Sequence, residues 1–217
     1  VMKRFHARGR GRSGGIISGK TNLTEFADYV SDVMPSGFSG AGGVVRNPHG
    51  TEYGRGQGSS VGSAASVAAS FAMVAIGTET QNSIQTPAAY SSVVGYKPSV
   101  GMVDRSGVFP LVPSQDSPGP LARNVRDTAL VAAILAGDTL GDTWSGTAGP
   151  DPTHGSPRTR LSGLRIGVPR QQIANRPEFA HLLPMFEDCL SRVAKAGAIV
   201  VDPCDLPCAD EIHDLRS

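Results

Sequence analysis

Residues 56–88 read GQGSSVGSAASVAASFAMVAIGTETQNSIQTPA, and this stretch is the most informative part of the chain. Two loops of small and polar residues flank an alanine-rich segment. Apolar residues recur at helical spacing in that segment, so we expect a helix over residues 63–73 that packs closely against a sheet or another helix. The second loop carries Ser83, and no histidine stands near it in the sequence to activate its hydroxyl. The chemistry of this serine is the main question that the sequence raises.

The rest of the chain alternates between short apolar runs and segments with helical periodicity. Strands are expected at 15–19, 91–97, 163–169 and 198–203, and helices at 21–30, 124–136 and 177–197. Asn124 is expected to cap its helix and Gly137 to end it. A strand–helix–strand unit favours parallel pairing. The predicted fold class is therefore α/β, a twisted mixed, largely parallel sheet flanked by helices, with the two serine loops adjacent at one rim.

The predicted organisation is one domain behind a short tail. Residues 1–14 form a basic Arg/Gly tail, and the domain covers 15–217. Its first part, 15–137, holds the core motifs. Residues 138–162 are rich in Gly, Asp, Thr, Ser and Pro and are expected to form an exposed loop or excursion. Residues 163–217 then supply the strand–helix–strand unit.

Composition excludes several classes of protein. Lys and Arg number 20 against 19 Asp and Glu, so no basic excess indicates a nucleic-acid partner. The uncharged stretch 56–78 is rich in Ser and Gly and too weakly apolar to predict a membrane span. Three cysteines do not form a disulfide framework, which favours reduced thiols and a cytoplasmic location. Cys204 and Cys208 lack CxxC spacing, so we expect no metal site.

The first serine loop also lacks the patterns of a nucleotide site. Residues 54–62, GRGQGSSVG, contain no GxxxxGK[ST] motif and break GxGxxG at its last glycine. We expect no cofactor. Taken singly, either loop could be a plain turn in which serines bond to the nearby backbone.

Taken together, the two loops resemble the amidase signature family of serine hydrolases. In that family a Gly-Gly-Ser-Ser-Gly-Gly-type loop supplies one serine and a Gly-Thr-Asp/Glu-x-x-x-Ser-Ile loop supplies the nucleophile. Ser59 and Ser83 match these positions and are 24 residues apart, the usual spacing of the family. The likeness extends through GKTNLTEF and SQDSPGP and is strong over residues 15–137. The GTET and SQDSPGP motifs resemble those of the peptide-amidase branch.

The resemblance implies an acyl-enzyme mechanism of the Ser-cisSer-Lys type. A buried neutral lysine takes a proton relayed by a serine on a cis peptide, which is Ser59 here, and Ser83 attacks the amide carbonyl. Backbone N–H groups at Thr80, Gln81, Asn82 and Ser83 are the expected oxyanion donors. The implied enzyme is an amidase, a hydrolase acting on C–N bonds other than peptide bonds, and its substrate is a small-molecule or peptide amide.

The sequence departs from the family pattern in the serine loops. Gln81 and Asn82 replace the common Gly-Gly before the nucleophile, Val61 replaces the glycine after the paired serines, and Gln85 replaces a frequent arginine. Asparagine tolerates positive φ better than most residues, so Gln81 and Val61 are the harder replacements to accommodate.

The family lysine has no counterpart in this sequence. It lies in a K-D-N-like context upstream of the GKTN segment, and neither Lys3 nor Lys20 has that context. The expectation is a central part of an amidase signature domain that hydrolyses amides weakly or not at all on its own.

Two alternatives stay open. The chain could be a non-catalytic binding or structural descendant of an amidase, or a protein similar to the amidase-family component of a tRNA-dependent amidotransferase. A serine-directed fluorophosphonate probe separates the first alternative from an enzyme, and dependence on glutamine and charged tRNA marks the second. No membrane or nucleic-acid partner is expected, and association into a homo-oligomer is left open.

Overall fold

The computed structural model describes residues 16–50, 52–136, 161–174 and 177–207. Internal contacts divide the chain into two compact units, Val1–His154 and Gly155–Ser217, here called unit 1 and unit 2. Both serine loops belong to unit 1. The predicted tail, the helix stop at Gly137 and nearly all of the predicted excursion lie outside the described residues.

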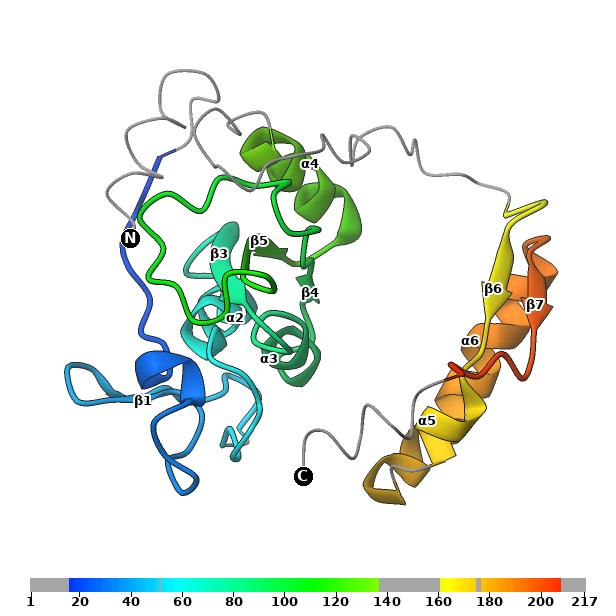
Figure 1. Cartoon of the computed structure of the whole chain (residues 1–217), viewed down its shortest axis with the longest axis horizontal. Helices are drawn as coiled ribbons and strands as arrows, with labels where there is room; N and C mark the ends of the chain where they lie inside the picture. The colour runs from blue at the N-terminus through cyan, green and yellow to red at the C-terminus, as the bar shows by residue number, and fades with distance from the viewer. Residues whose placement is uncertain (1–15, 51, 137–160, 175–176, 208–217) are drawn as a thin grey trace. The chain divides into compact units, whose positions relative to one another are not determined.

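Within the described residues, the larger sheet of unit 1 has three strands. β3 (Val74–Glu79) and β4 (Val94–Gly95) both pair with the central β5 (Ser117–Ala122), and both pairs are antiparallel (Figure 1). A short antiparallel pair, β1 (Phe38–Ser39) with β2 (Gly43–Val44), lies apart from it. The mixed α/β class is confirmed, but the expected parallel pairing is wrong for this sheet. The reason is that β3 and β5 were not expected as strands.

The central strand β5 contains two prolines, Pro118 and Pro120, which a central strand normally excludes. The Pro120 carbonyl accepts a hydrogen bond from Tyr96 N at 3.1 Å, so the backbone polar groups of Pro120 face the β4 side. Alternation along the strand places those of Pro118 on the same side. Because the missing N–H groups face β4, which is only two residues long, the ladder with β3 stays intact.

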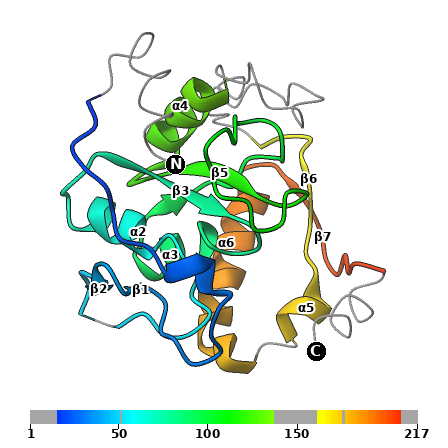
Figure 2. The same ribbon diagram turned by 60° about the vertical axis from the view of Figure 1, so that its left-hand side comes forward.

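Helices cover both faces of this sheet. α2 (Val61–Ala68) and α3 (Gln85–Tyr90) lie on one side and α4 (Val125–Ala136) on the other (Figure 2). The core cluster beneath α2 and α3 consists of Ala64, Ile84, Ala88 and Leu121. As predicted, Asn124 caps α4, because its Oδ1 accepts a hydrogen bond from Asp127 N at 2.9 Å.

The helix α2 is shorter than expected because the chain turns at Ser70, which has a φ of +61°. The residues from Val74 onward then form the edge strand β3. Hydroxyls from α2 and its N-terminal flank bond to the outer edge of that strand: Ser60 Oγ contacts Thr78 N and O, both at 3.1 Å, and Ser63 Oγ donates to Ile76 O at 2.8 Å. Within the described residues, these hydroxyls protect the edge in place of a fourth strand.

The expected strand and helix at the start of unit 1 are largely wrong. Residues 16–20 have no regular structure, and a 3-10 turn, η1 (Glu25–Asp28), replaces the helix. Three consecutive residues, Phe26, Ala27 and Asp28, have positive φ values, which a right-handed helix does not allow.

Unit 2 confirms the predicted strand–helix–strand order with parallel pairing. β6 (Arg165–Gly167) pairs in parallel with β7 (Ile199–Val201), and α5 (Arg170–Ala174), η2 (Pro177–Leu182) and α6 (Leu183–Lys195) connect them. Within the described residues, no helix is long and apolar enough to cross a membrane.

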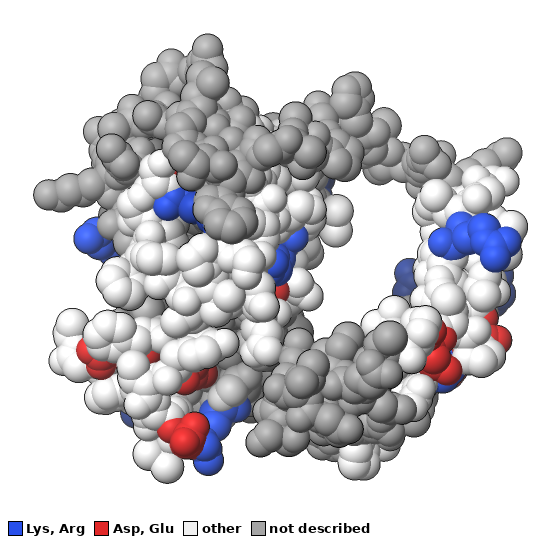
Figure 3. All heavy atoms as spheres, in the orientation of Figure 1, with Lys and Arg blue, Asp and Glu red and all other residues white. Residues whose placement is uncertain are grey.

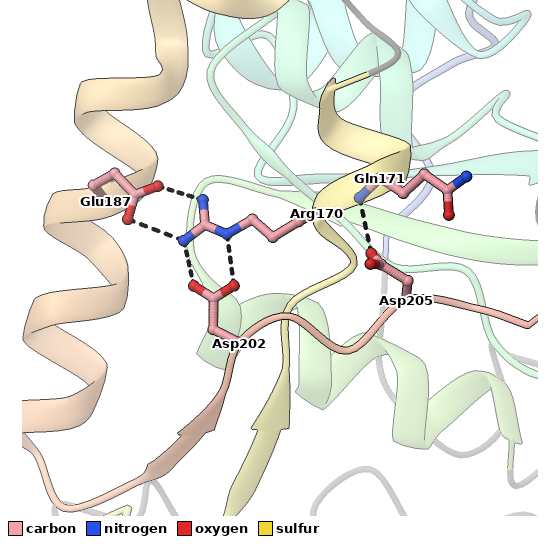
Figure 4. A network of polar contacts seen from close by, with 5 residues as sticks. All are labelled: Arg170, Gln171, Glu187, Asp202 and Asp205. Carbon is pink, nitrogen blue, oxygen red and sulfur yellow. Dashed lines mark hydrogen bonds and ion pairs between the residues drawn. The ribbon is translucent and has the colours of Figure 1, made fainter.

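An ion-pair network joins three elements of unit 2 (Figure 4). Arg170 of α5 donates hydrogen bonds from Nε to Asp202 Oδ1 at 2.7 Å and from Nη2 to Glu187 Oε2 at 3.2 Å. Its Nη1 also contacts Glu187 Oε1, and its Nη2 also contacts Asp202 Oδ2. The guanidinium also lies over the Phe186 ring, 5.8 Å from the centroid. Its hydrogen bonds lower the pKa of both Glu187 and Asp202.

Candidate active site

The two serine loops meet in unit 1, as predicted. Ser60 N donates to Ser83 O at 3.0 Å, which joins the residue after Ser59 to the expected nucleophile. Ser59 and Ser83 are both buried, with exposed fractions of 3% and 8%. A Cβ atom on Gly58 would lie 2.9 Å from Ser83 Cα and 2.8 Å from Pro87 Cδ. Because Gly58 also has a φ of +83°, only glycine allows the loops to approach this closely.

The nucleophile loop leads from strand β3 into helix α3. Ser83 lies in the turn that opens this helix, where Thr86 N donates to Asn82 O at 3.0 Å. Ile84, the next residue, is fully buried in the core cluster. The buried isoleucine fixes the chain direction directly after the serine.

Glu79 organises this turn, although the sequence motifs did not mark it as a site residue. Its carboxylate is buried, with an exposed fraction of 1%. Oε2 accepts hydrogen bonds from Ile84 N at 2.6 Å and Gln85 N at 2.8 Å, and Oε1 accepts from Gln85 Nε2 at 3.0 Å. A signal was present, because Glu79 is the first charged residue after the uncharged stretch 56–78. Gln85, at the position where the family often has arginine, thus still binds the carboxylate.

Asp116 holds the other side of the nucleophile loop. Thr80 Oγ1 donates a hydrogen bond to Asp116 Oδ1 at 2.6 Å. The same carboxylate accepts hydrogen bonds from Leu111 N, at 2.8 Å, and from Val112 N. Asp116 is buried, with an exposed fraction of 6%, and belongs to the SQDSPGP motif. That motif supported the family resemblance, but it gave no indication of a role for the aspartate.

The expected oxyanion donors have ordinary backbone geometry. Neither Gln81 nor Asn82 has a positive φ. The loop therefore does not need glycine at these two positions. Among the described residues, the N–H groups of Gln81, Asn82 and Ser83 have no hydrogen-bond acceptor. Asn82 Nδ2 donates to Gly56 O at 3.2 Å and makes a further link between the two loops.

Val61 is accommodated by a glycine elsewhere in the fold. Its side chain is fully buried, and a Cβ atom on Gly37 would lie 2.9 Å from Val61 Cγ2. Gly37 also has a φ of +93°. Val61, which stands where the family pattern has glycine, therefore packs against Gly37, where a larger residue would clash with it.

The segment that precedes Ser59 is fastened to the end of α3. Asn47 Nδ2 donates to Tyr90 O at 2.7 Å, and the Tyr53 hydroxyl bonds to Ser91 Oγ at 2.6 Å. Tyr53 is buried, and burial raises the pKa of its phenol. These contacts hold the residues before the first serine loop against the helix that follows the second.

The expected cis peptide at Ser59 is wrong for this structure. Among the described residues, the one cis peptide bond is Asp202–Pro203, in unit 2. The Ser59 loop turns instead through the positive φ of Gly58, which costs glycine little, whereas a cis bond before serine costs about 3 kcal/mol. Within the described part of the chain, no hydrogen bond joins the Ser59 and Ser83 hydroxyls or links Ser59 to a lysine.

Comparison with known proteins identifies the family of the chain. The Amidase family model matches residues 11–216. The chain is 37% identical over 207 residues to a glutamyl-tRNA(Gln) amidotransferase subunit of Symbiobacterium thermophilum, covering 95% of this chain and 40% of that protein. The solved peptide amidase of Stenotrophomonas maltophilia is 39% identical, with a TM-score of 0.76, covering 90% of this chain and 40% of that one. An amidase family protein from Bacillus anthracis gives 37% identity and a TM-score of 0.77, covering 93% of this chain and 40% of that one.

The chain belongs to the amidase family. It spans about 40% of the length of the relatives described above. Relatives from the amidotransferase and the peptide-amidase branches match at similar identity, 37% and 39%.

Proposed function

We propose that this chain carries the serine half of an amidohydrolase site, with Ser83 as the nucleophile and Ser59 as the proton relay. Ser83 Oγ attacks the carbonyl carbon of a carboxylic amide while its proton passes to Ser59 Oγ, and Ser59 passes a proton on to the leaving nitrogen as the C–N bond breaks, which leaves an acyl-enzyme and a free amine. Water then hydrolyses the ester and releases the acid. The observation that carries the proposal is the direct link between the loops, in which Ser60 N bonds to Ser83 O beside two buried serines.

Oxyanion stabilisation is assigned to the backbone N–H groups of Thr80, Gln81, Asn82 and Ser83. Those of Gln81, Asn82 and Ser83 have no acceptor among the described residues, and Glu79 and Asp116 hold the loop at either side. Fixed donors of this kind favour the negative charge that develops on the carbonyl oxygen. In other hydrolases, removing one such donor costs about 3 kcal/mol of transition-state stabilisation.

The proposed substrate is a small-molecule or peptide amide. The similarity to a peptide amidase and the presence of the GTET and SQDSPGP motifs support it. We further propose that the protein acts in the cytoplasm without a cofactor. Residues 15–217 are proposed to form the central part of an amidase signature domain behind a basic tail.

A second candidate function comes from the amidotransferase relatives. A protein similar to their glutamyl-tRNA(Gln) amidotransferase component would use Ser83 on the side-chain amide of glutamine. The 37% identity to such a relative over 95% of the chain favours this reading. Ammonia release that requires both glutamine and charged tRNA would distinguish it from a peptide amidase.

Acylation by an activated ester tests the proposal. A p-nitrophenyl ester loses its leaving group without a proton, so acylation is visible even where amide turnover is slow. We expect a burst of p-nitrophenolate approaching one equivalent of chain, with no burst in Ser83→Ala. The absence of a burst contradicts the proposal and supports a non-catalytic descendant. A burst that persists in Ser83→Ala also contradicts the proposal.

A further inference from the structure

Thr24 lies against the backbone of the Ser59 loop although it is 35 positions away in the sequence. Its side chain is fully buried, with an exposed fraction of 0%. It belongs to the GKTNLTEF segment, which contributes no side chain to the site described above. The contacts of this threonine are therefore unexplained by the acylation chemistry alone.

Three hydrogen bonds define its surroundings. Thr24 N donates to Ser59 O at 3.0 Å, and Thr24 Oγ1 donates to Gly58 O at 3.3 Å. The same hydroxyl accepts from Gly37 N at 2.7 Å. The Gly58 carbonyl belongs to the peptide unit before Ser59 and the Ser59 carbonyl to the unit after it. Thr24 thus holds both peptide planes that flank the serine.

These two planes determine where the Ser59 side chain starts. Fixing the peptide units on both sides of a residue fixes its φ and ψ, and with them the direction of the Cα–Cβ bond. Gly58, with its positive φ, is the residue of this turn with the greatest conformational freedom, so the adjacent hydrogen bonds restrict it most. A relay hydroxyl must lie within hydrogen-bond reach of its proton donor and acceptor.

We propose that Thr24 is a positioning residue for Ser59, which sets the relay hydroxyl through the peptide planes on either side of it. The proposal rests on the proposed function of Ser59 as a proton relay. The hydrogen bonds of Thr24 join it to backbone groups of the Ser59 loop and of Gly37, so it acts on Ser59 through the loop. Its hydroxyl donates one hydrogen bond and accepts one, both with backbone groups.

Three variants separate this role from general stability. Thr24→Val removes the hydroxyl with little change of shape, Thr24→Ser keeps it, and Thr21→Val is the matched control. Thr21 lies in the same segment, but its Oγ1 contacts Ser63 Oγ at 3.0 Å on helix α2 rather than the Ser59 loop. All are measured on the full chain.

The kinetic readout is the ester burst, analysed as a function of ester concentration. We expect Thr24→Val to slow the limiting acylation rate roughly tenfold while the half-saturating concentration stays the same, because only the relay geometry changes. Thr24→Ser restores the rate and Thr21→Val leaves it unchanged. A loss of rate in Thr24→Val that matches the loss in Thr21→Val overturns the proposal.

Hydrogen exchange gives a second readout that does not depend on acylation. The Ser60 amide, which donates to Ser83 O, reports whether the loop keeps its place. We expect faster exchange of this amide in Thr24→Val and wild-type exchange in Thr24→Ser and Thr21→Val. Unchanged exchange in Thr24→Val refutes the positioning role even if the wild type shows no burst, whereas a missing burst alone refutes only the proposed function.

Discussion

At the scale of single residues, the nucleophile turn depends on a buried carboxylate. Glu79 accepts hydrogen bonds from Ile84 N, Gln85 N and Gln85 Nε2, and no ion pair supports it among the described residues. Carboxylates hydrogen-bonded to backbone N–H groups are stable when buried, because those donors replace water. The charge itself is then less important than the acceptor oxygens.

Replacing Glu79 tests this reading. Glu79→Ala leaves two N–H groups without acceptors and is expected to lower the free energy of unfolding by about 2 kcal/mol or more. Glu79→Gln keeps one acceptor oxygen for the N–H pair, and the Gln85 amide can turn to accept from the new NH₂ group. We expect a much smaller loss there. Urea unfolding of both variants measures the difference, and equal losses would mean that the negative charge is what stabilises the turn.

The sequence predicted residues of this site unevenly. Ser59 and Ser83 could be placed in adjacent loops because motif spacing carries that information. Glu79 and Asp116 could not be given roles, because their partners are backbone N–H groups that only the fold brings within reach. The geometry at Ser59 was predicted as cis from the resemblance, whereas in this chain Gly58 makes the turn with a positive φ.

At the scale of elements, the outer edge of β3 is closed by serine hydroxyls rather than by a strand. Ser63 Oγ donates to Ile76 O at 2.8 Å and is buried, with an exposed fraction of 4%. The hydroxyl of Ser66, one turn further along α2, bonds only within its own helix, to Ser63 O at 2.8 Å. The two serines therefore differ in what their hydroxyls stabilise.

Alanine substitutions in α2 distinguish these two roles. Ser63→Ala leaves the Ile76 carbonyl unpaired and is expected to cost about 1–2 kcal/mol of unfolding free energy. Ser66→Ala is expected to stay within about 0.5 kcal/mol of the wild type, because alanine favours the helix interior. Thermal and urea unfolding give both values. If Ser66→Ala were as destabilising as Ser63→Ala, edge protection would not explain the hydroxyl of Ser63.

Elements were predicted best where side-chain chemistry marks them locally. Asn124 indicated the start of α4, and the apolar runs around residues 165 and 200 indicated the parallel strands of unit 2. β5 was missed because Pro118, Gly119 and Pro120 are unfavourable in a central strand. They are tolerated here because the neighbouring strand β4, which the prolines face, is only two residues long. β3 was missed because its alanine, valine and isoleucine continue the composition of α2, and only the turn at Ser70 separates them.

At the scale of the whole molecule, the chain consists of two compact units with different stabilising interactions. Unit 1 relies on a buried core and hydrogen-bonded loops, and its charged side chains are scattered over the face shown in Figure 3. Unit 2 contains the Arg170 network, which links α5, α6 and the segment after β7. We therefore expect the stability of unit 2 to depend on acid pH through this network.

The pH dependence of unit 2 follows from the lowered pKa values of Glu187 and Asp202, whose ordinary values are 4.5 and 3.8. A lowered pKa stabilises the fold above the ordinary value, and this stabilisation is lost as pH falls through the lower folded value. Arg170→Gln should therefore lower the melting temperature at neutral pH, and the difference from wild type should shrink as pH falls below 3.8, the lower of the two ordinary values.

The matched control is Arg192→Gln on α6, because Arg192 forms no ion pair with a described residue. We expect little change in the melting temperature at either pH. A penalty for Arg170→Gln that persisted undiminished at low pH would show that packing over Phe186, rather than the ion pairs, supplies the stabilisation.

The two serine loops are inferred to form one hydrolytic site in which Ser83 is the nucleophile. Mass spectrometry of the chain after reaction with a fluorophosphonate tests this inference most directly. No Lys or Arg lies between Arg55 and Lys97, so trypsin leaves both serines on one peptide and fragment ions must assign the adduct. We predict one adduct, on Ser83, that is lost in Ser83→Ala. An adduct on Ser59 or another residue, or no adduct at all, would contradict the inference.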